Sequence, residues 1–424
     1  MESKFYRTAL PGMPVVITEE IPYLHSIAIG IWVQTGSKNE KQGEEGLAHF
    51  IEHLVFKGTN QRSALEIARS IEKRGGSLDA FTTREVTAFY ARTLPEDVEL
   101  VMDVLSDLLL HPLFDANDIE KERGVVLEEI RESLDSPEEL AFDALMHCLF
   151  NGHPIAHPII GSKEVIQSVK RDKIISFYTE HYNPSSMIVA GAGKLNHQKL
   201  VELVQGYFPP SNQAPLQQMP PPDNHKPDTK VVPRDGFNQT HIALGRPLFP
   251  YSDKRRYALL LFNAIFGSGM SSRLFQAVRE HKGLVYNIFS FAELYRETGL
   301  FGIYLATDPS KVEQAILAIK EEVEKMRQEG VKEDEFKDAK AQIKGSILLA
   351  AESSGGRMQR LATGEIYIGK YRSIEEVIDR IEKIQKEELE EIFSLLLDTS
   401  LYSAGLAGKL PNNARELINE ILRS

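Results

Sequence analysis

Two short segments of this 424-residue chain recur at one fixed distance along the sequence. Ile27-Ala28-Ile29-Gly30 returns as Ile242-Ala243-Leu244-Gly245, and Ala192-Gly193-Lys194-Leu195 returns as Ala407-Gly408-Lys409-Leu410. Both pairs are separated by 215 residues. The same offset at two distant places indicates an internal duplication, which constrains the chain to fold as two related halves.

A proline-rich stretch at residues 209–233 lies between the two copies and has almost no apolar periodicity. Such a segment is typical of an extended, semi-rigid linker. We therefore expect an N-terminal domain at residues 1–208, a linker at 209–233 and a homologous C-terminal domain at 234–424.

The composition is that of a globular protein, with 42% apolar and 26% charged residues. A net charge of −12 argues against a nucleic-acid partner, which would need a basic face. The single cysteine, Cys148, excludes an internal disulfide framework and indicates a reducing compartment, with Cys148 as a small buried residue. The N-terminus has no apolar signal core and no apolar run is long enough for a membrane span, so we expect a cytoplasmic protein.

The pattern of the first half mixes strand pairs with separate helices, which predicts an α+β fold. The segment 27–33 is nearly all apolar and is expected to be a central strand covered on both faces. Its partner precedes it across a turn at 19–23. Other expected strands are 77–82, 87–93 and 187–192, and the expected helices are 45–57, 63–74, 96–110, 117–134, 137–151, 163–181 and 198–207.

The helix expected at 45–57 contains two histidines four residues apart, His49 and His53, with Glu52 beside them. Because a helical turn takes about 3.6 residues, these three side chains share one face. Two neutral imidazoles on one face can hold a zinc ion, with a carboxylate next to the open coordination position. The alternative is an amphipathic helix with two unrelated surface histidines.

A catalytic zinc ion needs a third protein ligand, and the helix expected at 117–134 is rich in carboxylates. Glu122 and Glu129 are two turns apart and nearly in line, and Val125 and Val126 lie between them. An inward-facing stripe of this kind would need a cation such as zinc. A solvated, charged helix with i,i+4 ion pairs explains the same pattern.

Longer motifs around these residues resemble the insulinase/pitrilysin peptidases of family M16, in the subfamily of the mitochondrial processing peptidase β subunit and its bacterial homologues. The matching segments are Gly46-Leu47-Ala48-His49-Phe50-Ile51-Glu52-His53-Leu54, Phe56-Lys57-Gly58-Thr59, Glu122-Arg123-Gly124-Val125-Val126-Leu127-Glu128-Glu129-Ile130, Gly75-Gly76-Ser77-Leu78-Asp79-Ala80-Phe81-Thr82, Gly267-Ser268-Gly269-Met270-Ser271-Ser272-Arg273-Leu274 and Val278-Arg279-Glu280-His281-Lys282-Gly283-Leu284-Val285-Tyr286. The resemblance implies two homologous α+β domains of the fold shared by LuxS and the processing peptidase, each an antiparallel sheet backed by helices.

The resemblance also implies the roles of the site residues. It places the third zinc ligand on Glu129, after His49 and His53, and makes Glu122 the carboxylate that orients a ligand histidine. Glu52 is then the general base. From the second half, Arg279 and Tyr286 match an Arg/Tyr pair that can hold the substrate carbonyl or the developing oxyanion.

A further implied element is an edge strand that binds substrate, containing Asp79, Ala80, Phe81 and Thr82. An extended peptide can add to such a strand through backbone hydrogen bonds, which favours unfolded substrates and broad specificity. Family members often have asparagine where this chain has Asp79, which leaves the substrate contact of that residue open.

We expect a zinc-dependent endopeptidase with one Zn²⁺ per chain that cleaves unstructured peptides or presequence-like segments. Because one chain contains both the zinc motif and the Arg/Tyr pair, a homodimer is expected to close the chamber that relatives form. The alternatives are a non-catalytic structural or assembly subunit, and the active half of a heterodimer with an inactive paralogue.

At the offset of 215 residues, His49, Glu52 and His53 fall on Ala264, Gly267 and Ser268, so the second half is predicted to lack metal ligands. A second histidine group surrounds a glycine and a proline at 152–154 and contains His147, His153 and His157. Its spacing fits no common zinc pattern, and we expect a structured loop there.

Overall fold

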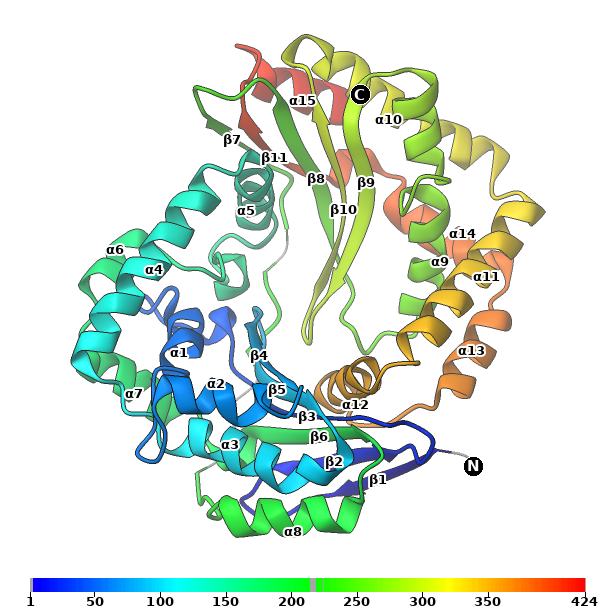
Figure 1. The fold of residues 1–424 in the computed structure, drawn as a ribbon. Coiled ribbons are helices and arrows are strands. Elements are labelled where there is room, and N and C mark those ends of the chain that lie inside the picture. The colour runs from blue at the N-terminus through cyan, green and yellow to red at the C-terminus, as the bar shows by residue number, and fades with distance from the viewer. Residues whose placement is uncertain (1–2, 214–218, 224, 424) are drawn as a thin grey trace. The chain divides into compact units, whose positions relative to one another are not determined.

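The computed structural model describes residues 3–213, 219–223 and 225–423. The chain forms two compact units, each built around its own sheet (Figure 1). The first unit comprises Met1–Arg131, His157–Gln218 and Leu349–Tyr371, and the second unit comprises Glu132–Ala156, Met219–Leu348 and Arg372–Ser424.

The sheet of the first unit has six strands in the order β1-β2-β6-β3-β5-β4. All neighbours are antiparallel except β2 and β6, which run parallel. The two strands expected at 13–34 exist, but β6 lies between them, so they do not pair with each other. The strands are β1 (Lys4–Thr8), β2 (Val15–Glu20), β3 (Ile27–Val33), β4 (Ser77–Thr82), β5 (Thr87–Thr93) and β6 (Met187–Gly193).

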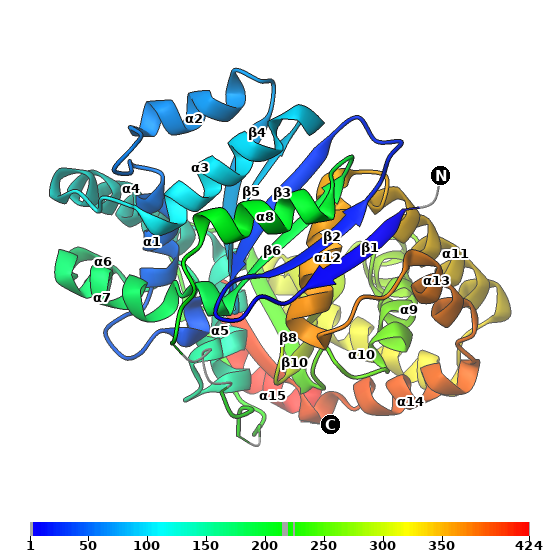
Figure 2. The same ribbon diagram turned by 90° about the horizontal axis from the view of Figure 1, so that it is seen from below.

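Strand β3 is central and buried along its whole length, as its apolar sequence predicts. Ile27, Ile29 and Ile31 alternate with Ala28 and Trp32, and the two sets enter different hydrophobic clusters. The isoleucine face is covered by α3 (Val98–Leu110) and α8 (His197–Tyr207), which lie beside each other (Figure 2). The opposite face is covered by α12 (Ser354–Ile368).

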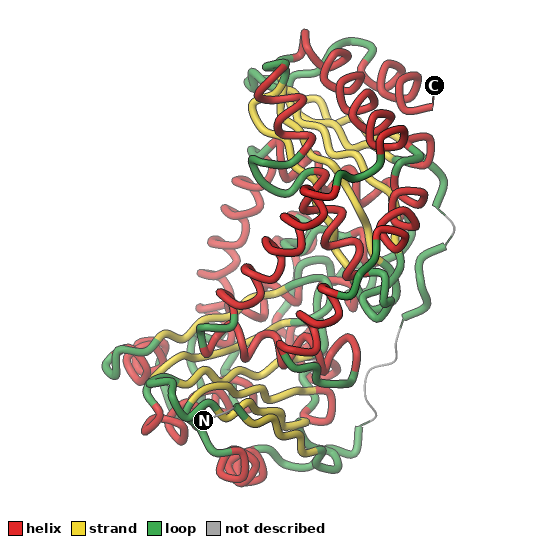
Figure 3. The backbone as a smooth tube through the Cα atoms, turned by 90° about the vertical axis from the view of Figure 1, so that its right-hand side faces the viewer, coloured by secondary structure: helices red, strands yellow, loops and turns green. Residues whose placement is uncertain are grey.

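The sheet of the second unit has five strands in the order β7-β11-β8-β10-β9, and here β7 and β11 form the parallel pair. Figure 3 shows the strands of each unit as a twisted layer with helices packed against it. The strands are β7 (Thr229–Pro233), β8 (Thr240–Leu248), β9 (Val285–Leu294), β10 (Gly299–Thr307) and β11 (Ser403–Gly408). One face packs against α9 (Arg256–Phe266), α10 (Val312–Glu329), α14 (Lys386–Leu396) and α15 (Ala414–Arg423).

The two sheets repeat one topology, because β2-β6-β3-β5-β4 matches β7-β11-β8-β10-β9 strand by strand, including the parallel pair. This agreement supports the duplication expected from the 215-residue offset. Both sheets are antiparallel, as expected, except at one parallel pair in each unit. The fold is α+β with two sheets backed by helices, as expected.

A helix from each half of the sequence packs in the unit of the other half. Helix α5 (Pro137–Phe150) covers one face of the second sheet, whereas α12 covers the equivalent face of the first. Helix α5 lies so close to β11 that a Cβ atom on Gly405 would be 2.1 Å from the carbonyl oxygen of Ala141. The expected continuous domains 1–208 and 234–424 therefore differ from the compact units, because apolar faces select their partners across the sequence.

Several element boundaries differ from the expectations. Helix α4 (Ala116–Leu134) begins one residue early, because the Asp115 carboxylate accepts the amide of Asn117 and so caps it. The helix expected at 163–181 is broken into α6 (Lys163–Ser168) and α7 (Arg171–His181). Arg123 donates hydrogen bonds to carbonyl oxygens at this break.

A third difference concerns the linker, whose end forms strand β7 (Thr229–Pro233) in the second sheet. Residues 214–218 and 224 of the linker lie outside the described residues. Cys148 is buried and free, as expected. Among the described residues, no helix combines the length and the apolar character needed to cross a membrane.

Candidate metal centre

Helix α1 (Leu47–Val55) positions the histidine motif. Its apolar side chains are buried in the core of the first unit, namely Leu47, Ala48, Phe50, Ile51, Leu54 and Val55. The remaining face carries His49, Glu52 and His53, which are partly exposed. The amphipathic pattern therefore fixes the outward direction of the three polar side chains.

Glu129 of α4 meets the two histidines of α1. The Nε2 atoms of His49 and His53 are 3.3 Å apart, and Oε2 of Glu129 lies 3.8 Å and 3.7 Å from them. Zinc–ligand bonds of 2.0–2.2 Å in tetrahedral geometry place ligand atoms about 3.3–3.6 Å apart. The chemistry of the three donors suits a zinc ion, and their mutual distances lie close to this range. No fourth donor joins the group among the described residues.

Helix α4 turns one row of side chains into the core. Ile119, Glu122, Val126 and Ile130 are buried, and Glu129 lies on the neighbouring row. The expectation that Val125 faces inward is wrong, because its side chain is 44% exposed. The row of Glu129 therefore borders the open side of the helix, where its carboxylate can reach a metal ion.

Glu122 connects His53 of α1 with Lys57, which lies just beyond the end of that helix. Its Oε2 atom is 3.4 Å from Nδ1 of His53, and its Oε1 atom is 2.9 Å from the ammonium group of Lys57. A carboxylate at Nδ1 places the proton there and leaves the Nε2 lone pair for a metal ion. Sequence reasoning missed Lys57 as a partner of the site, although it lies four residues after His53 within the helix expected at 45–57.

The electrostatics favour neutral imidazole at His49. Burial and the neighbouring His53 lower the pKa of His49 to about 4. A neutral ring at physiological pH keeps the Nε2 lone pair that metal binding requires. Its buried Nδ1 atom has no hydrogen-bond partner within the described part of the chain.

Glu52 is held by a residue of the neighbouring hairpin. The hydroxyl of Thr82, at the end of β4, donates a 2.5 Å hydrogen bond to Oε2 of Glu52. The pKa of Glu52 is raised, chiefly by burial. The Thr82 hydrogen bond and nearby His53 oppose this rise without cancelling it. Oε1 is then the oxygen available to exchange a proton, as a general base requires.

Strand β4 is the edge of the first sheet, as the resemblance implies. Its other side pairs with β5, and the strand lies against α1. Asp79 is exposed, and Ala80, Phe81 and Thr82 are partly exposed. Among the described residues, no strand pairs with the outer side of β4, which is the geometry that β-strand addition requires.

Arg279 and Tyr286 belong to the second unit. Arg279 lies in the π-helical segment Phe275–His281, and its guanidinium group is 4.7 Å from the ring centre of Phe275. Tyr286 lies in β9 and is 59% exposed. Both side chains are at the surface of their unit, and their role in the metal centre stays a prediction.

The second unit has no counterpart of the metal ligands on α9. This helix contains no histidine, cysteine or acidic residue. Ala264 lies within α9, whereas Gly267 and Ser268 follow its end. The constant offset therefore fails at this helix, because the loops before α1 and α9 differ in length.

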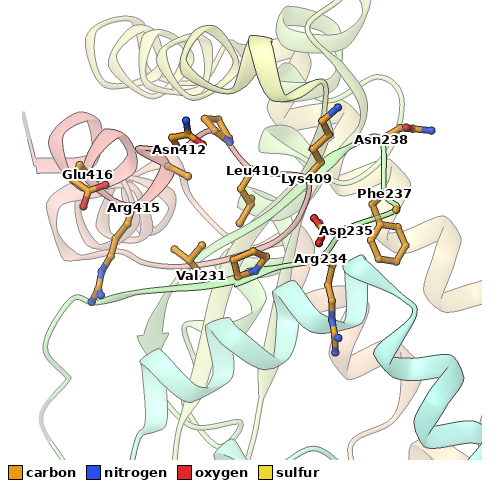
Figure 4. A pocket seen from close by; sticks show the side chains of 15 residues that line it. Val231, Arg234, Asp235, Phe237, Asn238, Lys409, Leu410, Asn412, Arg415 and Glu416 are labelled. Atoms are coloured by element: carbon orange, nitrogen blue, oxygen red, sulfur yellow. The ribbon is translucent and has the colours of Figure 1, made fainter.

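The other histidine group and a cavity of the second unit do not resemble the metal-binding group of α1 and α4. Within the described residues, His49, His53 and Glu129 form the only group of three or more possible ligands with metal-binding spacing. The three histidines at 147, 153 and 157 do not form such a group. His153 instead bonds the carbonyl of Pro220. A cavity of about 700 Å³ in the second unit is lined by Arg234, Lys409 and residues around them, and contains no predicted site residue (Figure 4).

Family models match most of the chain. The model described as insulinase (peptidase family M16) matches residues 15–163, and the model described as peptidase M16 inactive domain matches residues 168–343. An uncharacterized zinc protease of Mycobacterium tuberculosis is 36% identical over 423 residues, covering 99% of this chain and 96% of that protein. The chain therefore belongs to peptidase family M16.

A second relative supports this assignment, and two solved structures share the fold. The uncharacterized zinc protease YmxG of Bacillus subtilis is 31% identical over 399 residues, covering 94% of this chain and 97% of that protein. A crystal structure of a protease from Helicobacter pylori superposes with a TM-score of 0.91 at 21% identity, covering 96% and 99% of the two chains. The crystal structure of a peptidase M16 inactive domain from Pseudomonas fluorescens superposes with a TM-score of 0.88 at 20% identity, covering 97% of this chain and 98% of that chain.

Proposed function

We propose that the protein is a zinc-dependent endopeptidase that cleaves extended, unstructured peptides, presequence-like segments among them. The mutual distances of 3.3, 3.7 and 3.8 Å between the donors of His49, His53 and Glu129 carry this proposal. The naming of its relatives as zinc proteases supports it.

Each residue of the metal centre is assigned its own role in peptide hydrolysis. A zinc ion held by His49, His53 and Glu129 would lower the pKa of a bound water and polarise the scissile carbonyl. Glu52 takes the proton of the attacking water and returns it to the leaving amine. Glu122 fixes the tautomer and orientation of His53.

Substrate binding is assigned to the free edge of β4. A peptide that adds there as a further strand is held by its backbone, so the enzyme accepts many sequences and requires an unfolded segment. From the family resemblance, we assign Arg279 and Tyr286 of the second half to the substrate carbonyl or oxyanion. Their exposure leaves both side chains available for that contact.

The decisive experiment compares Glu52→Gln with the wild type in zinc content and in cleavage of a panel of unstructured peptides. The variant is expected to retain one zinc ion per chain and to lose at least about 100-fold in cleavage rate, the range of general-base catalysis. Glu128→Gln, a matched change at an exposed position of α4, is expected to alter neither. Equal cleavage by wild type and Glu52→Gln would refute the assigned base.

We further propose a homodimer, because this chain contains both the zinc motif and the Arg/Tyr pair that relatives combine in a closed chamber. Light scattering at micromolar concentration is expected to give twice the mass of one chain. A fully active monomer would contradict this proposal. The complete ligand set favours an enzyme over a non-catalytic assembly subunit, and activity of the purified chain alone would exclude an obligate inactive partner.

A further inference from the structure

The loop before the metal helix, residues 36–46, is unusually polar for a buried segment. Ser37, Lys38, Glu40 and Glu44 are all buried, and Glu40 is only 2% exposed. Burial of a carboxylate is costly unless hydrogen bonds compensate. The partners of Glu40 therefore indicate what this residue does.

The N-cap residue of helix α1 has no side chain with which to cap the helix. This residue is Gly46, with a φ of +98°, and a Cβ atom there would be 2.7 Å from the carbonyl oxygen of Ile160. Only glycine fits both the backbone conformation and the space. The usual capping residues are thereby excluded from this position, and the first amides of α1 need an acceptor from elsewhere.

Glu40 supplies that acceptor. Its Oε2 atom accepts the amide of Gly46 at 2.9 Å, and its Oε1 atom accepts the amide of Ala48 at 2.8 Å. The residue next to Ala48 is the proposed ligand His49. Because both oxygens accept N–H groups at the positive end of a helix, the ionised carboxylate fits this position. Burial raises the pKa of Glu40, and the two amide donors oppose this rise because they favour the ionised form.

The same loop is attached to the substrate hairpin at its other end. Lys38 forms a buried 2.5 Å ion pair with Glu85, and the amide of Lys38 donates to the carbonyl of Arg84 at 2.9 Å. The amide of Ser37 donates to the carbonyl of Thr83 at 3.2 Å. Loop 36–46 thus joins the β4–β5 turn to the first turn of α1.

We propose that Glu40 is a positioning residue of the metal centre, which fixes the first turn of α1 and thereby holds His49 within reach of the other two donors. The inference rests on the metal site of the proposed function. It adds a residue nine positions before His49 that contacts no metal ligand side chain and lies outside the histidine motif. The loop also sets the metal helix at a fixed position relative to β4.

The test compares Glu40→Gln with Glu45→Gln, which makes the same change in the same loop. Glutamine offers one acceptor oxygen, and its amide nitrogen would face a backbone N–H. Glu45 is partly exposed, and its carboxylate accepts only the amide of Gly43 among the described residues. We expect Glu40→Gln to bind zinc about 10–100-fold more weakly in chelator competition, as for other residues that support metal ligands, and Glu45→Gln to stay within about twofold.

A purely structural cap would give another result, namely a lower melting temperature with unchanged zinc affinity of the folded protein. Zinc affinity is therefore measured well below the melting temperature of both variants, and kcat is expected to fall while KM for peptides is unchanged. Wild-type zinc affinity in folded Glu40→Gln would overturn the inference alone. A wild-type protein that binds no zinc would overturn the proposed function and the inference with it.

If Glu40→Gln does not fold, the zinc affinity of Glu40→Asp tests the positioning role instead. Aspartate keeps the charge but is one methylene shorter, so it cannot reach both amides. At least threefold weaker zinc binding by folded Glu40→Asp supports the positioning role. Unchanged binding overturns it.

Discussion

The hydroxyl of Thr82 donates a hydrogen bond to Oε2 of Glu52, joining the edge strand β4 to the proposed general base of α1. The strand that is proposed to bind peptide is therefore also the element that orients the carboxylate. Motif spacing does not reveal this relationship, because the two residues are thirty positions apart.

The first prediction concerns this contact. Thr82→Val keeps the shape of the side chain and removes its donor, so Glu52 loses one fixed orientation. We expect kcat to fall about tenfold, because a hydrogen bond to a charged group contributes about 1.5 kcal/mol or more. Thr82→Ser restores the hydroxyl and should recover most of the rate. Wild-type kcat in Thr82→Val, measured by steady-state peptide cleavage, would exclude a role for the hydroxyl.

The second prediction concerns Glu122, which lies between His53 and Lys57. Glu122→Gln removes the charged acceptor at Nδ1 of His53 and leaves Lys57 without its ion-pair partner. Zinc affinity by chelator competition is expected to fall about 10–100-fold. Lys57→Met leaves the carboxylate in place and should weaken zinc binding less. The assignment fails if Glu122→Gln holds zinc as tightly as the wild type.

The third prediction concerns the pH dependence of the metal-free protein. The pKa of His49 is about 4 in the folded state and about 6.5 in an unfolded chain. As pH falls from 6.5 to 4, the unfolded chain therefore binds a proton that the folded chain does not, and stability is lost. The full window corresponds to about 3 kcal/mol.

His49→Gln is the comparison for this effect, because other titrating groups are common to both proteins. Urea unfolding at pH 7.5, 5.5 and 4.5 should show a smaller loss of stability on acidification in the variant. The same pH slope in both proteins would mean that His49 does not titrate as expected.

The fourth prediction tests the packing of α5 on the second sheet. A Cβ atom at Gly405 would collide with backbone atoms of α5, so Gly405→Ala forces the helix away from β11. We expect a loss of at least about 2 kcal/mol in the free energy of unfolding, within the range of overpacked cores. Gly206→Ala in α8, where a Cβ atom has open space, should be neutral or stabilising. Equal stability of both variants would show that α5 does not pack this closely in solution.

The local features of the site could be predicted from the sequence. His49, Glu52 and His53 share a face because the helical period is a property of the chain itself, and the apolar residues of α1 specify which face is buried. The strand pair 77–82 and 87–93 was also expected from the sequence, whereas the position of 77–82 at the edge of the sheet came from the family resemblance.

The third ligand could not be identified from local sequence patterns alone. Glu122 and Glu129 stand two turns apart on α4, and periodicity alone left both as candidates or as part of a solvated helix. The family resemblance assigned them, and the structure places Glu129 beside both Nε2 atoms and Glu122 at Nδ1 of His53.

By itself, the sequence determined the duplication, the α+β class and the histidine face of α1, because each depends on repeats or on periodicity within one segment. Tertiary structure decided the exchange of α5 and α12, the insertion of β6 between β2 and β3, and the capping of α1 by Glu40. Those features depend on which buried surfaces and unpaired amides meet across long stretches of chain, and no local pattern encodes that choice.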